Sequence, residues 1–165
     1  MWGTISKGFT LIELLIAIAI VAIISAVGLS TFPGAQKRAR DSVRQSDLNQ
    51  YRVALENYAS VNGGVYPVSS TGSLALPVPG TGIFLNSGGV LAGYLTGFPV
   101  DSKYNSSTNQ IYNYFYKSDA TGINWVLQAC LESGTNTIYR ICANGTVGTI
   151  SGSCPSAVAG VNLCP

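Results

Sequence analysis

The N-terminal third of the chain divides into an apolar half and an amphipathic half. Residues 9–32 have the sequence FTLIELLIAIAIVAIISAVGLSTF, and no charged residue occurs between positions 14 and 36. A helix rises about 1.5 Å per residue, so this run is long enough to cross a bilayer core of about 30 Å. Residues 36–62 are polar but keep helical periodicity, and one apolar stripe is formed by Val43, Leu48, Tyr51, Leu55, Tyr58 and Val61. The pattern predicts one long helix, with a transmembrane half at 9–35 and an amphipathic half at 36–62.

Three residues near the junction of these halves disfavour a regular helix: Gly28, Pro33 and Gly34. Proline removes one backbone hydrogen bond, and its ring clashes with the preceding turn. We therefore expect a kink or a locally unwound stretch at residues 28–34.

The remainder of the chain predicts a long connection followed by a small sheet. The sequence Asn62-Gly63-Gly64 ends the helix, and residues 63–109 are rich in Gly, Pro and Ser, with one helical turn expected near 90–95. Residues 110–117, 123–132 and 137–147 are rich in β-forming side chains and are separated by turn residues. They predict a three-stranded antiparallel β-meander within 110–147, followed by a tail at 148–165. The predicted fold class is therefore α+β, with the long N-terminal helix packed on the meander.

Successive side chains of a strand point to opposite sides, so the sequence shows which residues share a side in two of the predicted strands. The second strand places four apolar side chains on the side that we expect to pack on the helix stripe: Trp125, Leu127, Ala129 and Leu131. Three tyrosines of the first strand also share a side: Tyr112, Tyr114 and Tyr116. We interpret them as one face of a half-buried sheet rather than as a surface on which a ligand stacks.

Composition argues against an enzyme and against a nucleic-acid-binding protein. The chain is 47% apolar, carries a net charge of only +2 and contains no histidine. So small a net charge produces too weak an electrostatic field to favour nucleic acid as the main partner. The lack of histidine disfavours acid–base chemistry at neutral pH. We expect neither a cofactor nor a metal ion. Asp101 and Asp119 are too few and too far apart for a calcium site.

Glu13 is the one charge inside the apolar run, and it requires a partner. A carboxylate deep in lipid costs about 2.5–3.5 kcal/mol, and no Lys or Arg lies within the run. Cleavage between Gly8 and Phe9 would create an α-amino group four residues before Glu13, in its own chain or in a neighbour. A secretory signal peptide or a plain membrane anchor are the alternatives, and neither explains this carboxylate.

The segment KGFTLIELLIAIAIVAIISAV at 7–27 resembles the prepilin signature of type IV pilins and of the pseudopilins of type II secretion. The resemblance implies that residues 1–8 are a leader peptide, which a membrane prepilin peptidase removes after Gly8 before methylating the amine of Phe9. It places the family's assembly glutamate at Glu13, and it implies a pilin-like fold in which the apolar helix becomes the filament core.

The basic residues at the start of the amphipathic half favour ion pairing. They are Lys37, Arg38, Arg40 and Arg44. Lipid-headgroup or DNA binding are alternatives, but acidic residues at 41, 47 and 56 are interleaved on the same helix. More Lys and Arg residues follow the apolar run than precede it, and basic residues flanking a membrane span usually lie on the cytoplasmic side. This distribution alone would place the C-terminal part of the chain in the cytoplasm. The cysteines and the prepilin resemblance favour export instead, with the C-terminal head outside a single-pass anchor.

Four cysteines occur, all in the head, and their even number is typical of disulfides in an oxidising compartment. They lack any C-x-x-C pair, which disfavours zinc. Three pairings are possible. We favour Cys130 with Cys142, on adjacent strands, and Cys154 with Cys164, within the tail. Crossed bonds that tie the tail to the sheet are the alternative.

The sequence therefore predicts a pilin: a structural subunit that is held in the cytoplasmic membrane, processed by prepilin peptidase and polymerised into an extracellular pilus. Its expected partners are other copies of itself, the lipid bilayer before assembly, and the prepilin peptidase and assembly machinery. Adhesion, motility and DNA uptake are the roles open to such a filament. A pseudopilin of a type II secretion or competence system is the alternative, and a membrane-anchored binding head that never polymerises is the third possibility.

Overall fold

The computed structural model describes residues 8–68, 74–76, 89–105, 110–154 and 163–164. Its longest element is α1 (Leu11–Val61), which confirms the single long helix expected from the sequence. The chain forms two compact units, residues 1–37 and residues 38–165, so that α1 contributes to both. Each unit is described by itself below, the first as the N-terminal unit and the second as the head.

The locally unwound stretch expected at 28–34 is absent, because α1 remains helical through Gly28, Pro33 and Gly34. A proline in a helix interior costs about 3 kcal/mol, largely through one lost hydrogen bond. The unbroken turns on both sides of Pro33 hold the backbone helical despite this cost. The expectation of a locally unwound stretch was therefore wrong for this structure, and the alternative of a kink at these residues stays a prediction.

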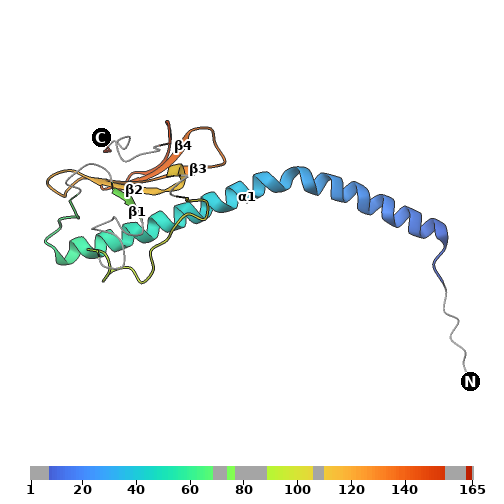
Figure 1. The fold of residues 1–165 in the computed structure, drawn as a ribbon, viewed down its shortest axis with the longest axis horizontal. Helices are drawn as coiled ribbons and strands as arrows, with labels where there is room; N and C mark the ends of the chain where they lie inside the picture. The colour runs from blue at the N-terminus through green and yellow to red at the C-terminus, as the bar shows by residue number, and fades with distance from the viewer. Residues whose placement is uncertain (1–7, 69–73, 77–88, 106–109, 155–162, 165) are drawn as a thin grey trace, which may run out of the picture. The chain divides into compact units, whose positions relative to one another are not determined.

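The head contains one antiparallel sheet whose strands follow chain order, as Figure 1 shows. The strands are β1 (Leu74–Leu76), β2 (Tyr114–Ser118), β3 (Trp125–Leu131), β4 (Thr137–Cys142) and β5 (Val147–Ser151). Strands β2 to β4 confirm the predicted meander. The short 3₁₀ helix η1 (Gln110–Tyr112) replaces the start of the first predicted strand.

Strands β1 and β5 were not predicted. Residues 137–147 were expected to form one strand, but a turn at residues 143–146 divides them, and Gly145 in this turn has a φ of 83°. The dipeptide Asn144-Gly145 is a strong hairpin signal, because it tolerates positive φ at a tight turn. That signal marks the β4–β5 hairpin and could have been recognised in the sequence.

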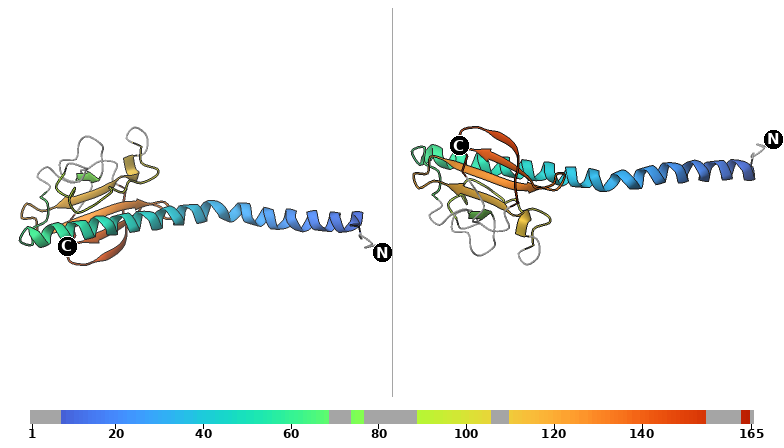
Figure 2. Two further views of the ribbon diagram at one scale, coloured as in Figure 1. Left: turned by 90° about the horizontal axis from the view of Figure 1, so that it is seen from below. Right: turned by 90° about the horizontal axis from the view of Figure 1, so that it is seen from above.

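One face of the sheet packs against the part of α1 that belongs to the head, as both views in Figure 2 show. The predicted inward face of β3 is confirmed, because all four of its apolar side chains are buried together with Leu48, Tyr51 and Leu55 of α1. The two ends of the predicted helix stripe do not pack, since Val43 is 57% exposed and Val61 is 67% exposed. The stripe is therefore correct only at its centre.

The end of α1 is closed by glycines in the left-handed conformation. Gly63 and Gly64 have φ values of 68° and 82°, and the Gly64 amide donates a hydrogen bond of 2.8 Å to the Ala59 carbonyl. This arrangement satisfies carbonyls that have no partner within the helix. The turn expected near 90–95 is also present, since the Leu95 amide bonds to the carbonyl of the fully buried Leu91 at 3.1 Å.

Candidate functional site

The predicted cleavage site lies immediately before the helix. Gly8 and Phe9 are exposed and non-helical, and 92% of the Phe9 surface is accessible. The bond between them therefore lies outside the hydrogen-bonded helix, on the surface of the chain. The rest of the predicted leader, residues 1–7, lies outside the described residues.

Thr10 and Glu13 form a capping box at the start of α1. The Glu13 carboxylate accepts hydrogen bonds from the backbone amide of Thr10, at 2.8 Å, and from its hydroxyl, at 2.7 Å. The Thr10 hydroxyl in turn accepts the Glu13 amide at 3.3 Å. Reciprocal bonds of this kind satisfy amides that have no partner in the first turn of a helix. Glu13 therefore has a partner within its own chain, which the sequence analysis missed although Thr-x-x-Glu before an apolar run is a recognisable signal.

The N-terminal unit leaves its large apolar side chains uncovered. Over residues 11–24 the exposed fractions of the large apolar side chains run from 51% at Leu15 to 76% at Leu11, and Ile16, Ile20 and Ile24 are exposed to a similar degree. An apolar surface of this extent marks contact with lipid or with another protein chain. Among the residues that the structure describes, no helix combines the length and the hydropathy needed to span a membrane.

Arg44 lies at the centre of a buried charge cluster in the head. Its guanidinium donates to Asp101, to Asp41 at 2.7 Å and to Glu132 at 2.6 Å, and its side chain is only 2% exposed. Three segments far apart in the sequence meet here: α1, the segment after Pro99, and the end of β3. The ion pairing predicted for Arg44 and Arg40 is confirmed, but two of the acidic partners come from outside the helix.

Glu132 receives two further cations. Arg40 donates to both of its carboxylate oxygens at 2.8 Å, and Lys103 donates to Oε2 at 2.7 Å. These hydrogen bonds, the one from Arg40 foremost, hold the pKa of Glu132 well below its usual value of 4.5. Burial alone would lower the pKa of Arg44, but its bonds to Asp101 and Glu132 outweigh burial and raise it. The cluster thus pairs three basic side chains, Arg40, Arg44 and Lys103, with three acidic ones, Asp41, Asp101 and Glu132.

Asp41 joins the helix to the backbone after β3. Its two oxygens accept the amides of Glu132 and Ser133, both at 2.8 Å. Burial raises its pKa, but the bonds from Ser133 and Glu132 together lower it below its usual value. A second buried carboxylate, Asp47, accepts the hydroxyl of Tyr114 at 2.6 Å, and burial raises its pKa. Tyr114 and Tyr116 are both buried in the core, which confirms sheet packing for these two tyrosines.

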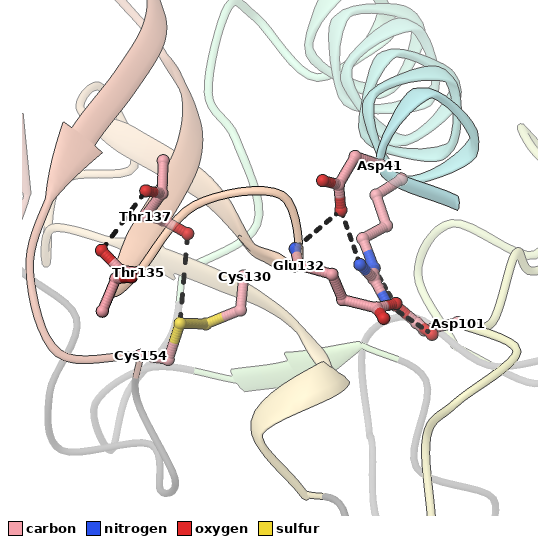
Figure 3. The surroundings of a disulfide bond; sticks show 8 residues. Asp41, Asp101, Cys130, Glu132, Thr135, Thr137 and Cys154 are labelled. Atoms are coloured by element: carbon pink, nitrogen blue, oxygen red, sulfur yellow. Dashed lines mark hydrogen bonds and ion pairs between the residues drawn. A yellow bond between two sulfur atoms is a disulfide. The ribbon is translucent and has the colours of Figure 1, made fainter. Parts of the chain in front are cut away.

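The predicted disulfide pairing was wrong. The structure joins Cys130 to Cys154 and Cys142 to Cys164, with Cα separations of 5.7 and 6.0 Å. Figure 3 shows the first of these bonds, together with the nearby Asp41, Asp101 and Glu132. The open alternative of crossed bonds is thus the one observed.

Strand register explains why the favoured pairing fails. Cys130 lies opposite Ile138, and Cys142 lies opposite Val126, so the two cysteines are four residues apart along the same face. At about 3.3 Å per residue that offset is about 13 Å, and a disulfide needs Cα atoms within about 7 Å. Instead, each cysteine of the sheet bonds to one in the tail. Leu163 and Cys164 pack on Phe115 and Val126, on the face of the sheet opposite the helix.

The predicted site residues thus lie in separate places. Gly8, Phe9 and Glu13 lie together at the start of α1, whereas Gly28, Pro33 and Gly34 lie within it and the cysteines lie in the head. Thr10, Asp101 and Glu132 were not predicted to belong to a site. Within the described ranges, no group of three or more His, Cys, Asp or Glu side chains is arranged to hold a metal ion.

Comparison with known proteins places the resemblance at the N-terminus. Residues 4–29 match the family described as the prokaryotic N-terminal methylation motif. The chain is 38% identical over 76 residues to the major component of the type IV wide pilus of Thermus thermophilus, covering 46% of this chain and 57% of that protein. It is 32% identical over 90 residues to prepilin peptidase-dependent protein D of Escherichia coli, covering 54% of this chain and 61% of that protein.

A type IV major pilin of Neisseria gonorrhoeae is 37% identical over 75 residues, covering 46% of this chain and 35% of that protein. The chain therefore spans between about a third and three fifths of the length of these curated relatives. No solved structure matches the chain with comparable significance.

Proposed function

Because this chain belongs, through its N-terminal segment, to the type IV pilin and pseudopilin family, we propose that it is the structural subunit of an extracellular type IV pilus-like filament. The observation that carries the proposal is the uncovered apolar face of the N-terminal unit, headed by an accessible Gly8-Phe9 bond and by Glu13. A single chain has no cover for this face. A bilayer covers it before assembly, and neighbouring subunits cover it afterwards.

The processing step follows from the same segment. Prepilin peptidase hydrolyses the Gly8-Phe9 bond, which releases residues 1–8 and leaves an amine on Phe9 that is then methylated. The exposure of both residues supports this assignment. The new cation lies one helical turn before Glu13, where the helix would otherwise present a carboxylate to an apolar environment.

Assembly is then driven by apolar contact and directed by charge. Apolar helices from many subunits pack into a core, in which small side chains such as Ala22 and Ala26 permit close approach. The Glu13 carboxylate neutralises the Phe9 amine of an incoming subunit, which fixes the axial register. The contact joins two different surfaces and does not close on itself, so it generates a fibre. Adhesion, motility and DNA uptake are the roles that such a fibre would serve.

The capping box makes a sharp test of Glu13 possible. Glu13→Gln keeps an acceptor for Thr10, because glutamine also serves at this position of a capping box, but it removes the charge. Glu13→Ala removes both. If charge sets the register, both variants insert into the membrane and are cleaved, and both yield at least tenfold less sheared surface filament than the wild type. If assembly depends only on the capping role of Glu13, the Glu13→Gln variant assembles normally, and this result would contradict the charge-pairing step.

Intact mass and N-terminal sequencing of the wild-type chain test the function itself. Chains from sheared surface filaments are expected to begin at N-methylated Phe9 and to contain two disulfides. The same processed chain confined to membranes would favour a pseudopilin, which shares this N-terminal chemistry. A chain that still begins at Met1 and remains in membranes would overturn both and leave an anchored binding head.

A further inference from the structure

The two disulfides of the head are interleaved along the chain. Cys142 lies between the partners of the Cys130–Cys154 bond, and Cys154 lies between those of the Cys142–Cys164 bond. Figure 3 shows how the first bond joins the segment after β5 to β3, where the Cys154 sulfur lies 4.0 Å from the carbonyl oxygen of Thr137. Such a pattern cannot arise when each cysteine joins its nearest neighbour in the sequence.

Before the sheet forms, the statistics of the chain favour consecutive pairing. Cys130 and Cys142 are 12 residues apart, and Cys154 and Cys164 are 10 residues apart. The observed bonds span 24 and 22 residues. The probability that two points of an unfolded chain meet falls with about the three-halves power of the length between them, so each consecutive pair meets about threefold more often. The chain is also made from its N-terminus, so Cys130 and Cys142 meet an oxidant before Cys154 does.

Consecutive pairing is incompatible with the folded sheet. With β3 and β4 in register, Cys130 and Cys142 are offset by about 13 Å along the strands, which is beyond the reach of a disulfide. A chain that carries both consecutive bonds cannot correct itself either. Its four cysteines are then all joined, so it has no thiolate of its own to attack a disulfide. An external thiol is therefore required.

The observed bonds are protected once the sheet has formed. Each contains one cysteine of the sheet, and both Cys130 and Cys142 are only 2% exposed. Cys142 packs with Phe115 and Val126 on the face of the sheet opposite the helix. Thiol–disulfide exchange requires access to a sulfur atom, so an external thiol reaches the bonds of an unfolded chain far more readily than those of the folded head. Exchange therefore continues until the head folds with the observed pairing.

We propose that a thiol–disulfide isomerase acts on this chain after an oxidase that carries a disulfide has joined its cysteines in consecutive pairs. The oxidase accepts two electrons for each bond that it makes, and the two thiol protons are released. The inference rests on the proposed function, because the head must be exported to meet both enzymes. It adds a partner that the observed pairing requires.

The rearrangement itself needs no further oxidant. The isomerase thiolate attacks Cys130 of the Cys130–Cys142 bond, which forms a mixed disulfide and releases the thiolate of Cys142. That thiolate attacks Cys164, which forms the Cys142–Cys164 bond and releases the thiolate of Cys154. The thiolate of Cys154 then attacks Cys130 in the mixed disulfide, which forms the Cys130–Cys154 bond and returns the isomerase thiolate. Each step breaks one S–S bond and forms another, so no net electrons are transferred.

Disulfide mapping of the full-length chain, made in cells with and without the isomerase, tests this partner. Free thiols are blocked with N-ethylmaleimide, and the chain is cut after Arg140 with trypsin and between Asn144 and Gly145 with hydroxylamine. Crossed bonds leave the three fragments that contain cysteine linked together, whereas consecutive bonds leave residues 145–165 separate. The two threefold preferences multiply, so cells that lack the isomerase should give at least about fivefold less of the linked product.

Two bypass variants control for other effects of removing the isomerase. They are Cys142→Ser with Cys164→Ser, and Cys130→Ser with Cys154→Ser. Each leaves two cysteines, which can only join as they do in the structure. Each variant is compared with itself in the two kinds of cell, so any loss of stability affects both samples equally. The amount of disulfide-bonded chain should agree within about twofold, because no exchange is needed.

Three outcomes would overturn the inference. Equal amounts of the linked product with and without the isomerase would mean that the head folds before its cysteines join. A bypass variant that depends on the isomerase as strongly as the wild type would mean that the enzyme assists folding without exchanging disulfides. Four free thiols in the wild-type chain, in cells that contain both enzymes, would mean that the head is not exported, and the proposed function would fail with the inference.

Discussion

The hydroxyl of Thr10 donates a hydrogen bond of 2.7 Å to the carboxylate of Glu13, and the Thr10 backbone amide donates another of 2.8 Å. The carboxylate of the apolar segment is thus held in the first turn of its own helix before any second chain is present. Its position is fixed by local backbone geometry, so in the proposed filament the amine of a neighbouring subunit would meet a preorganised acceptor. Thr10 is in this sense a positioning residue for Glu13.

Thr10→Val is expected to fray the start of α1, because it removes both side-chain bonds of the capping box while keeping the shape of the residue. Loss of an N-cap costs about 1 kcal/mol, equivalent to about fivefold faster exchange of the amides at residues 14–16. Hydrogen exchange measured by mass spectrometry on the detergent-solubilised chain would detect it. Thr10→Ser keeps the hydroxyl and should behave like the wild type, and equal exchange in both variants would contradict the capping role.

Arg44→Met is expected to destabilise the head by about 3–5 kcal/mol, because it leaves the carboxylates of Asp101, Asp41 and Glu132 without their central cation. Urea unfolding followed by Trp125 fluorescence measures the loss, in a chain that begins at Phe9 and therefore lacks Trp2. Arg52→Met is the control. Its pair with Glu56 is exposed and spans 3.7 Å, so the change should be within about 0.5 kcal/mol. Equal effects would mean that the buried cluster contributes no more than a surface pair.

The head should lose stability in acid. The folded state lowers the pKa values of Glu132 and Asp41, so as the pH falls the unfolded chain takes up protons at these sites first. Their contribution is complete above about pH 5 and declines progressively below it. Asp47 acts in the opposite direction, because burial raises its pKa, and it offsets part of the loss.

Urea midpoints between about pH 7 and pH 2.5 test this dependence. The wild-type midpoint should fall with pH, and Glu132→Gln should give a lower midpoint at neutral pH but a flatter profile, because one of the responsible groups is gone. A wild-type midpoint that is constant down to the acid end would exclude the charge cluster as a source of stability.

Thiol counting distinguishes the two disulfide patterns. The double variant Cys130→Ser, Cys142→Ser removes one partner from each observed bond, so Cys154 and Cys164 should both titrate as free thiols under denaturing conditions. The adjacent-strand pairing would leave those two bonded and give no free thiol. Removing only the observed pair Cys142 and Cys164 should cost about 3 kcal/mol, because a loop of roughly 20 residues is released in the unfolded chain.

The parts of the fold that depend on local pattern could be predicted from the sequence. The extent of α1, strands β2 to β4 and the inward face of β3 follow from periodicity that a single element reveals. The predicted unwinding near Pro33 failed for the opposite reason: Pro33 is a local signal, and the helix around it outweighed that signal.

The missed features depend on register and on distant pairing. Whether Cys130 can reach Cys142 is decided by which residues of β3 and β4 lie opposite each other, and a shift of a few residues changes the answer. Arg44 was assigned acidic neighbours on its own helix, but Asp101 and Glu132 reach it only after the chain has folded. The residues proposed for cleavage and charge pairing could be proposed from the sequence alone, because they lie within a single short segment.

Gly122 and Gly63 provide a matched pair that separates backbone strain from steric overlap. Both have a φ of 68°, but a Cβ at Gly122 would lie 2.6 Å from the Tyr66 carbonyl oxygen, whereas a Cβ at Gly63 would meet nothing within 4 Å. Gly63→Ala should therefore cost only the strain of a left-handed residue, about 1–2 kcal/mol.

Gly122→Ala should cost about 1–3 kcal/mol more, because the added methyl group forces the turn away from Tyr66, whose amide bonds to the Gly122 carbonyl at 2.8 Å. Urea unfolding of the two variants measures the difference between them. That difference reports how firmly the segment after α1 is held to the β2–β3 turn. A loosely attached turn would move aside, and the two variants would then lose equal amounts of unfolding free energy.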